Sequence, residues 1–201
     1  DLDAGDFVID ALGTRFAGEY GSDNYLAKDY FMGAEDGAAR STYFRKGTQG
    51  QNTIVIGKQN MNASCKPTFK FDSSNTKQND DLNFTPDDKS TAYTVTDLSS
   101  CYAEDKGSVQ RGIRFLNGRR QILVQDEIKK QNKEIQWRVQ TNATVELSKD
   151  KKTATLTITE VHAPNAAIDK MMINIPKAQM KATILSPSNA QFAVAPACDK
   201  K

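Results

Sequence analysis

The stretch Thr153-Ala154-Thr155-Leu156-Thr157-Ile158-Thr159 decides the fold, because apolar and polar side chains alternate along its whole length. In an extended chain every second side chain lies on the same face, so Ala154, Leu156 and Ile158 face a core together. The same period of two recurs over residues 134–140. This pattern predicts half-buried β-strands and not helices.

The rest of the chain reads in the same way, as short runs rich in Val, Ile, Thr, Tyr and Phe between clusters of Gly, Asn, Asp and Lys. Hairpin turns are predicted at Leu12-Gly13-Thr14 and at Leu116-Asn117-Gly118-Arg119, since Asn-Gly accepts the positive φ of a tight turn. One or two helical turns are expected over Pro164–Met171. The predicted strands are Asp6–Leu12, Arg15–Tyr20, Ser41–Lys46, Thr53–Gly57, Thr68–Asp72, Ala92–Asp97, Val109–Leu116, Gln121–Lys129, Glu134–Thr141, Ala143–Leu147, Thr153–Thr159, Met171–Ile175, Ala182–Ser186 and Gln191–Val194.

So many antiparallel strands bury their apolar faces by stacking one layer on another. The predicted fold class is therefore all-β, a large antiparallel two-layer β-sandwich of the super-sandwich type. Residues 1–201 are expected to form a single domain, in which the polar stretch Ser73–Lys89 is a surface loop.

The composition excludes several classes of protein. Hydrophobic residues make up 38% of the 201 residues, which is enough for a core. The net charge of +2 gives no reason to expect a nucleic-acid partner, and no apolar run has the roughly 18–20 residues of a membrane helix. The single histidine, His162, excludes a His-rich metal site and any two-histidine mechanism within this chain.

Sequons and cysteines favour a secreted protein. Asn62, Asn83 and Asn142 each begin an Asn-X-Ser/Thr glycosylation sequon, and the sequon of Asn83 is the weakest because Pro86 follows it. The chain begins at Asp1 without an initiator Met, so we expect it to be the C-terminal part of a longer precursor.

Three cysteines leave two alternatives open. In an oxidising compartment Cys65 and Cys101 form a disulfide, and Cys198 is free or pairs with a missing segment. In the other alternative all three are buried, reduced thiols.

Five segments occur in the order found in one known family: residues 1–13, 18–25, 40–54, 119–128 and 135–141. Together they resemble the C-terminal β-domain of heparinase II/III-like polysaccharide lyases, over roughly residues 1–160. Among them are the opening Asp-rich strand, a Gly-then-Tyr segment and an Arg/Tyr-rich strand followed by Gln-Asn-Thr.

The resemblance implies a partner domain and a reaction. Family members carry an N-terminal α/α toroid that shares the catalytic groups, so this domain alone is expected to be catalytically incomplete. The implied reaction is β-elimination on an acidic, uronic-acid polysaccharide. One group neutralises the C5 carboxylate, a Tyr or His takes the C5 proton, and a Tyr protonates the leaving glycosidic oxygen.

The resemblance also implies roles for single residues. Tyr25 corresponds to the catalytic tyrosine of the family, although it lies further from Gly21 than usual; Tyr20, Tyr30 and Tyr43 are the substitutes. The family's catalytic His falls two positions before Asp1, outside the chain. His162 is expected to be a surface or hydrogen-bonded histidine without a function.

Four residues are implied on the substrate-binding side: Arg40, Tyr43, Arg45 and Asn52. A guanidinium group pairs with a carboxylate through two hydrogen bonds, which suits Arg40 and Arg45. Asn52 takes the position of the family's His-Asn-Thr segment, where it is expected to orient backbone more than to touch sugar.

Asp1, Glu19 and Gln51 take the positions of the family's zinc ligands, and both histidines of that set are missing. Oxygen donors, with Asp3 added, suit Ca²⁺ better than zinc. The alternative is that no metal binds and that Gln51 and Glu19 bond to each other. Loss of the zinc histidines keeps a second function open, a non-catalytic carbohydrate-binding or structural module.

Overall fold

The computed structural model describes residues 1–21, 24–33, 39–72, 92–105, 107–162 and 172–197. Three short 3-10 helices are present: η1 (Arg40–Thr42), η2 (Thr48–Gly50) and η3 (Ser99–Asp105). The strands are β1 (Ile9–Ala11), β2 (Thr14–Ala17), β3 (Ile54–Ile56), β4 (Thr68–Asp72), β5 (Tyr93–Asp97), β6 (Ser108–Leu116), β7 (Gln121–Lys129), β8 (Ile135–Trp137), β9 (Thr144–Leu147), β10 (Thr153–His162) and β11 (Met172–Thr183).

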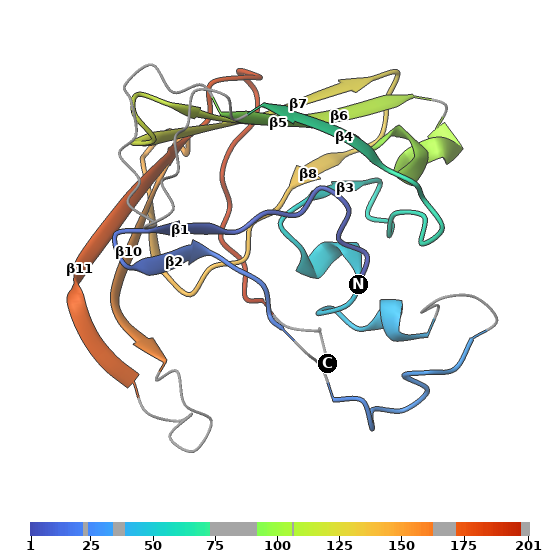
Figure 1. Ribbon diagram of the computed structural model, residues 1–201, viewed down its shortest axis with the longest axis horizontal. Helices are drawn as coiled ribbons and strands as arrows, with labels where there is room; N and C mark the ends of the chain where they lie inside the picture. Colours follow the sequence, from blue (N-terminus) through green and yellow to red (C-terminus); the bar gives the residue numbers. More distant parts are fainter. Residues whose placement is uncertain (22–23, 34–38, 73–91, 106, 163–171, 198–201) are drawn as a thin grey trace.

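The all-β prediction is confirmed, and every strand pairing in the described residues is antiparallel. The sheets have the strand orders β1-β2, β3-β8, β11-β10-β9 and β4-β5-β6-β7. Figure 1 shows the four-stranded sheet along the top, the three-stranded sheet curving down the left side, and the β1-β2 hairpin beside it. The stacking of all these strands into two layers stays a prediction.

Both predicted hairpin turns are present. Leu12 and Gly13 join β1 to β2 with φ of 53° and 76°, and residues 117–120 join β6 to β7, with φ of 53° at Asn117 and 61° at Gly118. Positive φ at both central residues matches the right-handed twist of the paired strands. The second turn sets the register of β6 on β7, in which Arg111 lies opposite Asp126.

Some strand predictions are wrong. Ser41–Lys46 contains no strand, because its backbone closes local turns; the N–H groups of Lys46 and Gly47 both donate to Tyr43 O. Gln191–Val194 is not a strand either.

Other strand predictions need new boundaries. Met171–Ile175 and Ala182–Ser186 were predicted as separate strands, but residues of both belong to the continuous strand β11. Pro176 within it lowers the sequence signal for a strand. The predicted loop Ser73–Lys89 and the predicted helical turns of Pro164–Met171 lie outside the described residues.

Two apolar clusters form the interior. The first contains Ile54 and Ile56 of β3, Val109 of β6, and Leu98 and Cys101. The second lies between the β1-β2 hairpin and the β9–β11 sheet; its buried members are Phe16, Ala154, Leu156, Ile158 and Ala178. The inward set predicted from alternation in Thr153–Thr159 is therefore confirmed.

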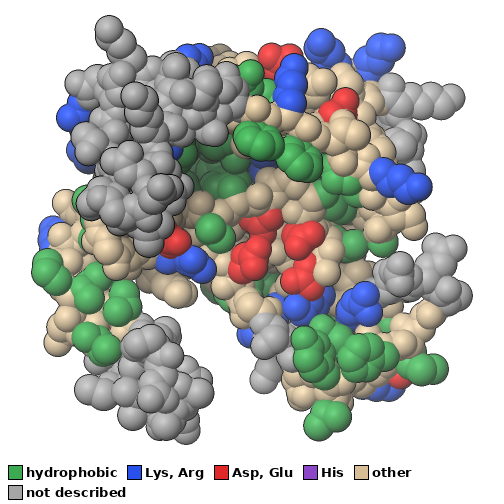
Figure 2. All heavy atoms as spheres, viewed as in Figure 1, with side chains coloured by type: hydrophobic (Ala, Val, Ile, Leu, Met, Phe, Trp, Pro, Cys, Tyr) green, Lys and Arg blue, Asp and Glu red, His purple; other side chains and the backbone are tan. Residues whose placement is uncertain are grey.

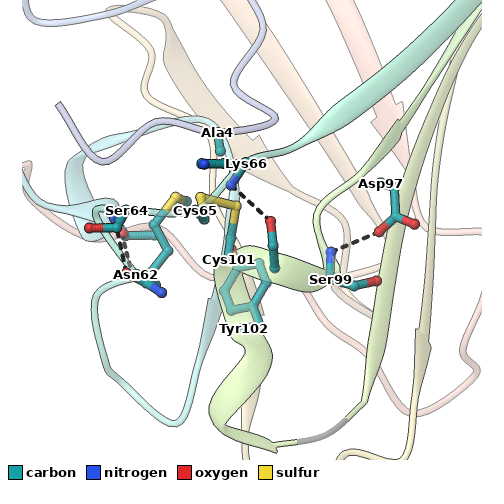
Figure 3. The surroundings of a disulfide bond; sticks show 12 residues. Ala4, Asn62, Ser64, Cys65, Lys66, Asp97, Ser99, Cys101 and Tyr102 are labelled. Atoms are coloured by element: carbon teal, nitrogen blue, oxygen red, sulfur yellow. Dashed lines mark hydrogen bonds between the residues drawn. A yellow bond between two sulfur atoms is a disulfide. The ribbon is translucent and has the colours of Figure 1, made fainter.

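A disulfide joins Cys65 to Cys101 and closes the first cluster (Figure 3). Hydrogen bonds hold both flanks: Lys66 N–H donates to Ser100 Oγ at 3.0 Å, and Asn62 N–H donates to Cys101 O at 2.9 Å. The structure thus contains the bridged alternative for these two cysteines. Cys198 lies outside the described residues.

No helix in the described part of the chain is both long and apolar enough to cross a membrane.

Candidate functional site

Asn52 lies at the junction of four chain segments and has no exposed surface. Its Nδ2 group donates to Phe7 O at 2.8 Å and to Gly18 O at 3.0 Å, while its Oδ1 accepts from Gln140 N–H at 2.6 Å. Both amide protons and the amide oxygen of Asn52 are thus bonded to backbone groups of the protein. Asn52 therefore orients backbone, and its assignment to substrate binding stays a prediction.

Arg111 of β6 supports this junction from the four-stranded sheet. Its guanidinium group is 1% exposed and forms two parallel bonds to Asp126, from Nε at 2.7 Å and from Nη2 at 2.9 Å. The Nη1 group donates to Gly5 O at 2.8 Å and to Asn52 O at 2.9 Å. A buried ion pair whose remaining protons are bonded is stable, and breaking it is costly.

Asp6 is the carboxyl group closest to this network. Its Oδ1 accepts from the N–H groups of Phe7 and Asn52, whereas its Oδ2 is buried and has no hydrogen-bond partner among the described residues. Burial, with a smaller contribution from the nearby charge of Glu19, raises the pKa of Asp6 to about 6 against the opposing effect of its hydrogen bonds to Phe7 and Asn52. Asp6 is therefore a carboxyl group that changes charge close to neutral pH.

Lys46 occupies the position where the sequence placed a cation. Its ammonium group is buried and lies 2.9 Å from Asp1 Oδ1 and 3.3 Å from Gly21 O. Gln51 is also buried, and its amide donates to Arg45 O at 2.9 Å. Asp1 thus already has a cationic partner that the protein supplies.

The residues present do not fit a zinc or calcium site. A metal ion at Asp1 would meet the positive charge of Lys46, and Glu19 is exposed to solvent. The described part of the chain holds no group of three or more His, Cys, Asp or Glu side chains suited to a metal. No step of the chemistry below is therefore routed through a metal.

Aromatic rings connect the predicted catalytic tyrosine to the predicted substrate-binding residues. Tyr25 packs edge-on against Tyr30 with ring centroids 5.2 Å apart, and Tyr30 stacks on Tyr43 at 6.4 Å. The Tyr43 hydroxyl donates to Lys28 O, which ties residues 24–33 to the segment that carries Arg45. The structure thus brings Tyr25 and Tyr43 into one cluster.

The exposed side of this cluster is apolar. Tyr25 is 57% exposed, and Leu26, Phe31 and Met32 are more exposed still. Figure 2 shows hydrophobic side chains gathered at the lower right of the molecule, over this segment, and acidic side chains gathered at the centre of the same face beside Lys and Arg. An accessible tyrosine therefore lies on a face that also carries charge of both signs.

The arginines differ in their surroundings. Arg45 is half-buried; its Nη1 donates to Tyr20 O at 3.1 Å, and its guanidinium group lies 5.8 Å from the Tyr20 ring centroid. Tyr20 in turn donates its hydroxyl proton to Gln140 Oε1 at 2.9 Å. Arg40 is half-buried at the start of η1. Both arginines lie on the segment that follows the aromatic cluster.

Two of the three sequon asparagines are described, and both are exposed. Asn62 lies next to the disulfide, where its Oδ1 accepts from Ser64 N–H at 2.9 Å (Figure 3). Asn142 precedes β9. Asn83 lies outside the described residues, and glycosylation of all three stays a prediction.

Sequence reasoning missed Arg111, Asp126, Lys46 and Asp6. For the first two the only signal was the Asn-Gly turn, and it gives the wrong register: a two-residue turn would set Arg111 opposite Val124, whereas the observed connection 117–120 sets it opposite Asp126. Lys46 and Asp6 had none, because their partners are distant in sequence.

The family model described as "Heparinase II/III-like, C-terminal" matches residues 2–191. No curated protein matches the chain.

Proposed function

Since the chain belongs to the heparinase II/III-like C-terminal family, a polysaccharide lyase-related group, we propose that it is the β-domain of a secreted lyase that cleaves uronic-acid glycans by β-elimination. An N-terminal α/α toroid of the same precursor supplies the remaining catalytic groups, so the domain alone is catalytically incomplete. The observation that carries this proposal is the aromatic cluster, which presents Tyr25 on the same stretch of chain as Arg40 and Arg45.

In the proposed reaction a base removes the C5 proton, the C4–O bond breaks, and the leaving oxygen receives a proton. While the adjacent carboxylate keeps its full charge, the C5 proton is too weakly acidic for a base to remove it near neutral pH. Arg40 and Arg45 pair with that carboxylate, a base among the remaining catalytic groups takes the C5 proton, and the Tyr25 hydroxyl donates its proton to the leaving glycosidic oxygen. Tyr43 lines the substrate side of the cluster, and Asn52 holds the backbone behind it.

Secretion is part of the proposal. The Cys65–Cys101 disulfide and the exposed sequons at Asn62 and Asn142 support an oxidising, extracellular location.

The test compares the full precursor carrying Tyr25→Phe with the unmodified precursor on alginate, glucuronan and heparin-type polymers. Elimination creates an unsaturated product that absorbs ultraviolet light, and we expect Tyr25→Phe to lower its rate at least about 100-fold, the contribution of a proton-transfer group. Tyr102→Phe is the matched control, because that hydroxyl is buried and bonded to Ile54 O, away from the cluster. Equal rates for the two variants would exclude Tyr25 from catalysis.

A second function is favoured by the Asp1–Lys46 ion pair, since the residues at the family's metal positions do not fit a metal. In that case the domain binds a polysaccharide or has a structural role, without catalysis. Binding of the same polymers with no unsaturated product from the full precursor would establish the binding module in place of the lyase.

A further inference from the structure

A groove runs across the four-stranded sheet on the face opposite the buried Arg111. Side chains alternate along β6, so Gln110, Gly112 and Arg114 share one face, and Val109 and Arg111 face the core. The groove has a volume of about 400 Å³, and Gly112 lies in its floor. It is separate from the aromatic cluster, which lies in residues 24–46.

The register of the sheet shows how the groove is built. Gly112 lies between Val95 of β5 and Gln125 of β7, so the missing side chain leaves a hollow over the central strand. One row further along, Arg114 lies between Tyr93 and Leu123. Glycine inside a strand weakens the sheet and often marks a site where a ligand comes close to the backbone.

The walls of the groove combine one ring, the apolar side chains of Val95, Ile113 and Leu123, and several planar polar groups. Tyr93 is 38% exposed, which offers its ring to a partner. Gln110, Arg114, Gln125 and Glu127 are all exposed, and the Gln125 amide donates to Glu127 Oε1 at 3.2 Å. A ring or apolar surface with a few convergent polar groups is the usual composition of a small-ligand site.

Sugars match this arrangement. The C–H face of a sugar ring packs on an aromatic or apolar surface, and its hydroxyls exchange hydrogen bonds with amide and carboxylate groups. The residues from Gln110 to Arg114 span about 13 Å of strand, which is longer than one sugar ring. The groove therefore suits a run of sugar units and not a single monosaccharide.

Charge sets the class of sugar. Arg114 forms no ion pair or side-chain hydrogen bond with another described residue. Its guanidinium group is thus available for a carboxylate, which it pairs through two parallel bonds. Glu127 lies in the row of Gln110, at the opposite end from Arg114, where its carboxylate accepts hydrogen bonds from sugar hydroxyls.

We propose that the outer face of β5, β6 and β7 is a second, non-catalytic glycan site that binds an oligosaccharide carrying carboxylates. The uronic-acid class of this ligand rests on the proposed function; the site itself rests on the groove.

The decisive variant is Gly112→Val. Apart from its chain neighbours, a Cβ built on Gly112 comes no closer than 3.8 Å to any atom, so the strand accepts a side chain there, and Val favours a strand more than Gly does. We expect calorimetric titration of the chain with alginate or glucuronan oligosaccharides to show binding, and Gly112→Val to weaken it at least tenfold without lowering the melting temperature.

Arg114→Ala tests the carboxylate. We expect about tenfold weaker binding of the uronic-acid oligosaccharides, the loss of a charge-assisted pair. Lys181→Ala removes the same charge from an exposed position on β11 and is expected to bind as the wild type does. A neutral oligosaccharide of the same length should bind the wild type more weakly than the acidic one; equal binding would overturn the acidic class.

The proposal is overturned if the wild type binds none of these probes, or if Gly112→Val binds them as tightly as the wild type. Tyr25→Phe separates the two proposals. If Tyr25→Phe loses the elimination activity and still binds oligosaccharide in the groove, both proposals are supported. If Tyr25→Phe keeps full elimination activity, only the catalytic role of Tyr25 is excluded.

Discussion

At the scale of single residues, Asp6 makes the stability of the protein depend on pH. Its pKa is raised from 3.8 to about 6, chiefly by burial, so the folded state prefers the neutral carboxyl group. This contribution to stability is fully present below pH 3.8 and is lost as pH rises through about 6. Its size is on the order of 1 kcal/mol, because part of the group is screened by solvent.

We therefore predict that the wild type loses stability between pH 5 and pH 7.5. The variant Asp6→Asn should keep the same stability across this range. The amide keeps an acceptor for Phe7 N–H and Asn52 N–H and carries no charge. Melting temperatures of the two proteins measured across this range test the prediction. Parallel curves would mean that Asp6 titrates as an ordinary carboxyl group.

The ammonium group of Lys46 supplies the positive charge beside Asp1, where the family resemblance implied a metal ion. We predict that Lys46→Met lowers the free energy of unfolding by about 2 kcal/mol, less than for a fully buried pair because Asp1 keeps access to water. A chelator, or added calcium, should leave the melting temperature of the wild type unchanged.

Lys58→Met is the control for Lys46→Met, since its ion pair with Glu134 is exposed and 3.6 Å long. We expect it to change stability by less than about 0.5 kcal/mol. A large shift on chelation would restore the metal site that the geometry argues against.

At the scale of elements, the disulfide holds the segment after β3 against η3. The bridge spans 36 residues of sequence, and β4 and β5 lie within that loop. Closing a loop of this length restricts the unfolded chain by roughly 4 kcal/mol in the chain-entropy model. We predict a loss of about that size in the double variant Cys65→Ala and Cys101→Ala, measured by urea unfolding.

Cys198→Ala controls for the loss of a cysteine as such and is expected to unfold like the wild type. A double variant as stable as the wild type would show that the loop is already restricted in the unfolded chain.

At the scale of the whole molecule, a polar junction lies between the two apolar clusters. Asn52 bonds to Phe7 and Gly18, which flank β1 and β2, and to Gln140, which lies between β8 and β9. Arg111 connects the four-stranded sheet to this junction, because its Nη1 group donates to Asn52 O. One buried residue, through its side chain and its carbonyl oxygen, thus connects segments that pack on different clusters.

We predict that Asn52→Ala lowers the free energy of unfolding by at least about 3 kcal/mol, because it leaves three buried backbone groups without partners. Calorimetry should show a lower melting temperature and a broader transition as the two clusters lose their connection. Asn132→Ala, at an exposed position, is expected to stay within about 0.5 kcal/mol of the wild type. Identical behaviour of the two variants would remove Asn52 from this role.

Local pattern was enough to predict the strands, the turn at Asn117-Gly118 and the inward faces of β10, because alternation and turn chemistry depend on neighbouring residues. It failed at Ser41–Lys46, where Thr, Tyr and Phe have high strand propensity and yet the backbone bonds locally. Propensity describes what a residue favours, and the partners available in space decide the outcome.

The amino-acid sequence by itself therefore determined the all-β class, the family resemblance and the residue types of the tyrosine and arginine candidates. Only the tertiary structure decided that Asn52 is sealed inside, that Lys46 pairs with Asp1, and that Gly112 opens a groove. Each of these depends on contacts between residues far apart in the chain or on neighbouring strands. Burial and charge pairing are properties of such contacts, and no run of neighbouring residues contains them.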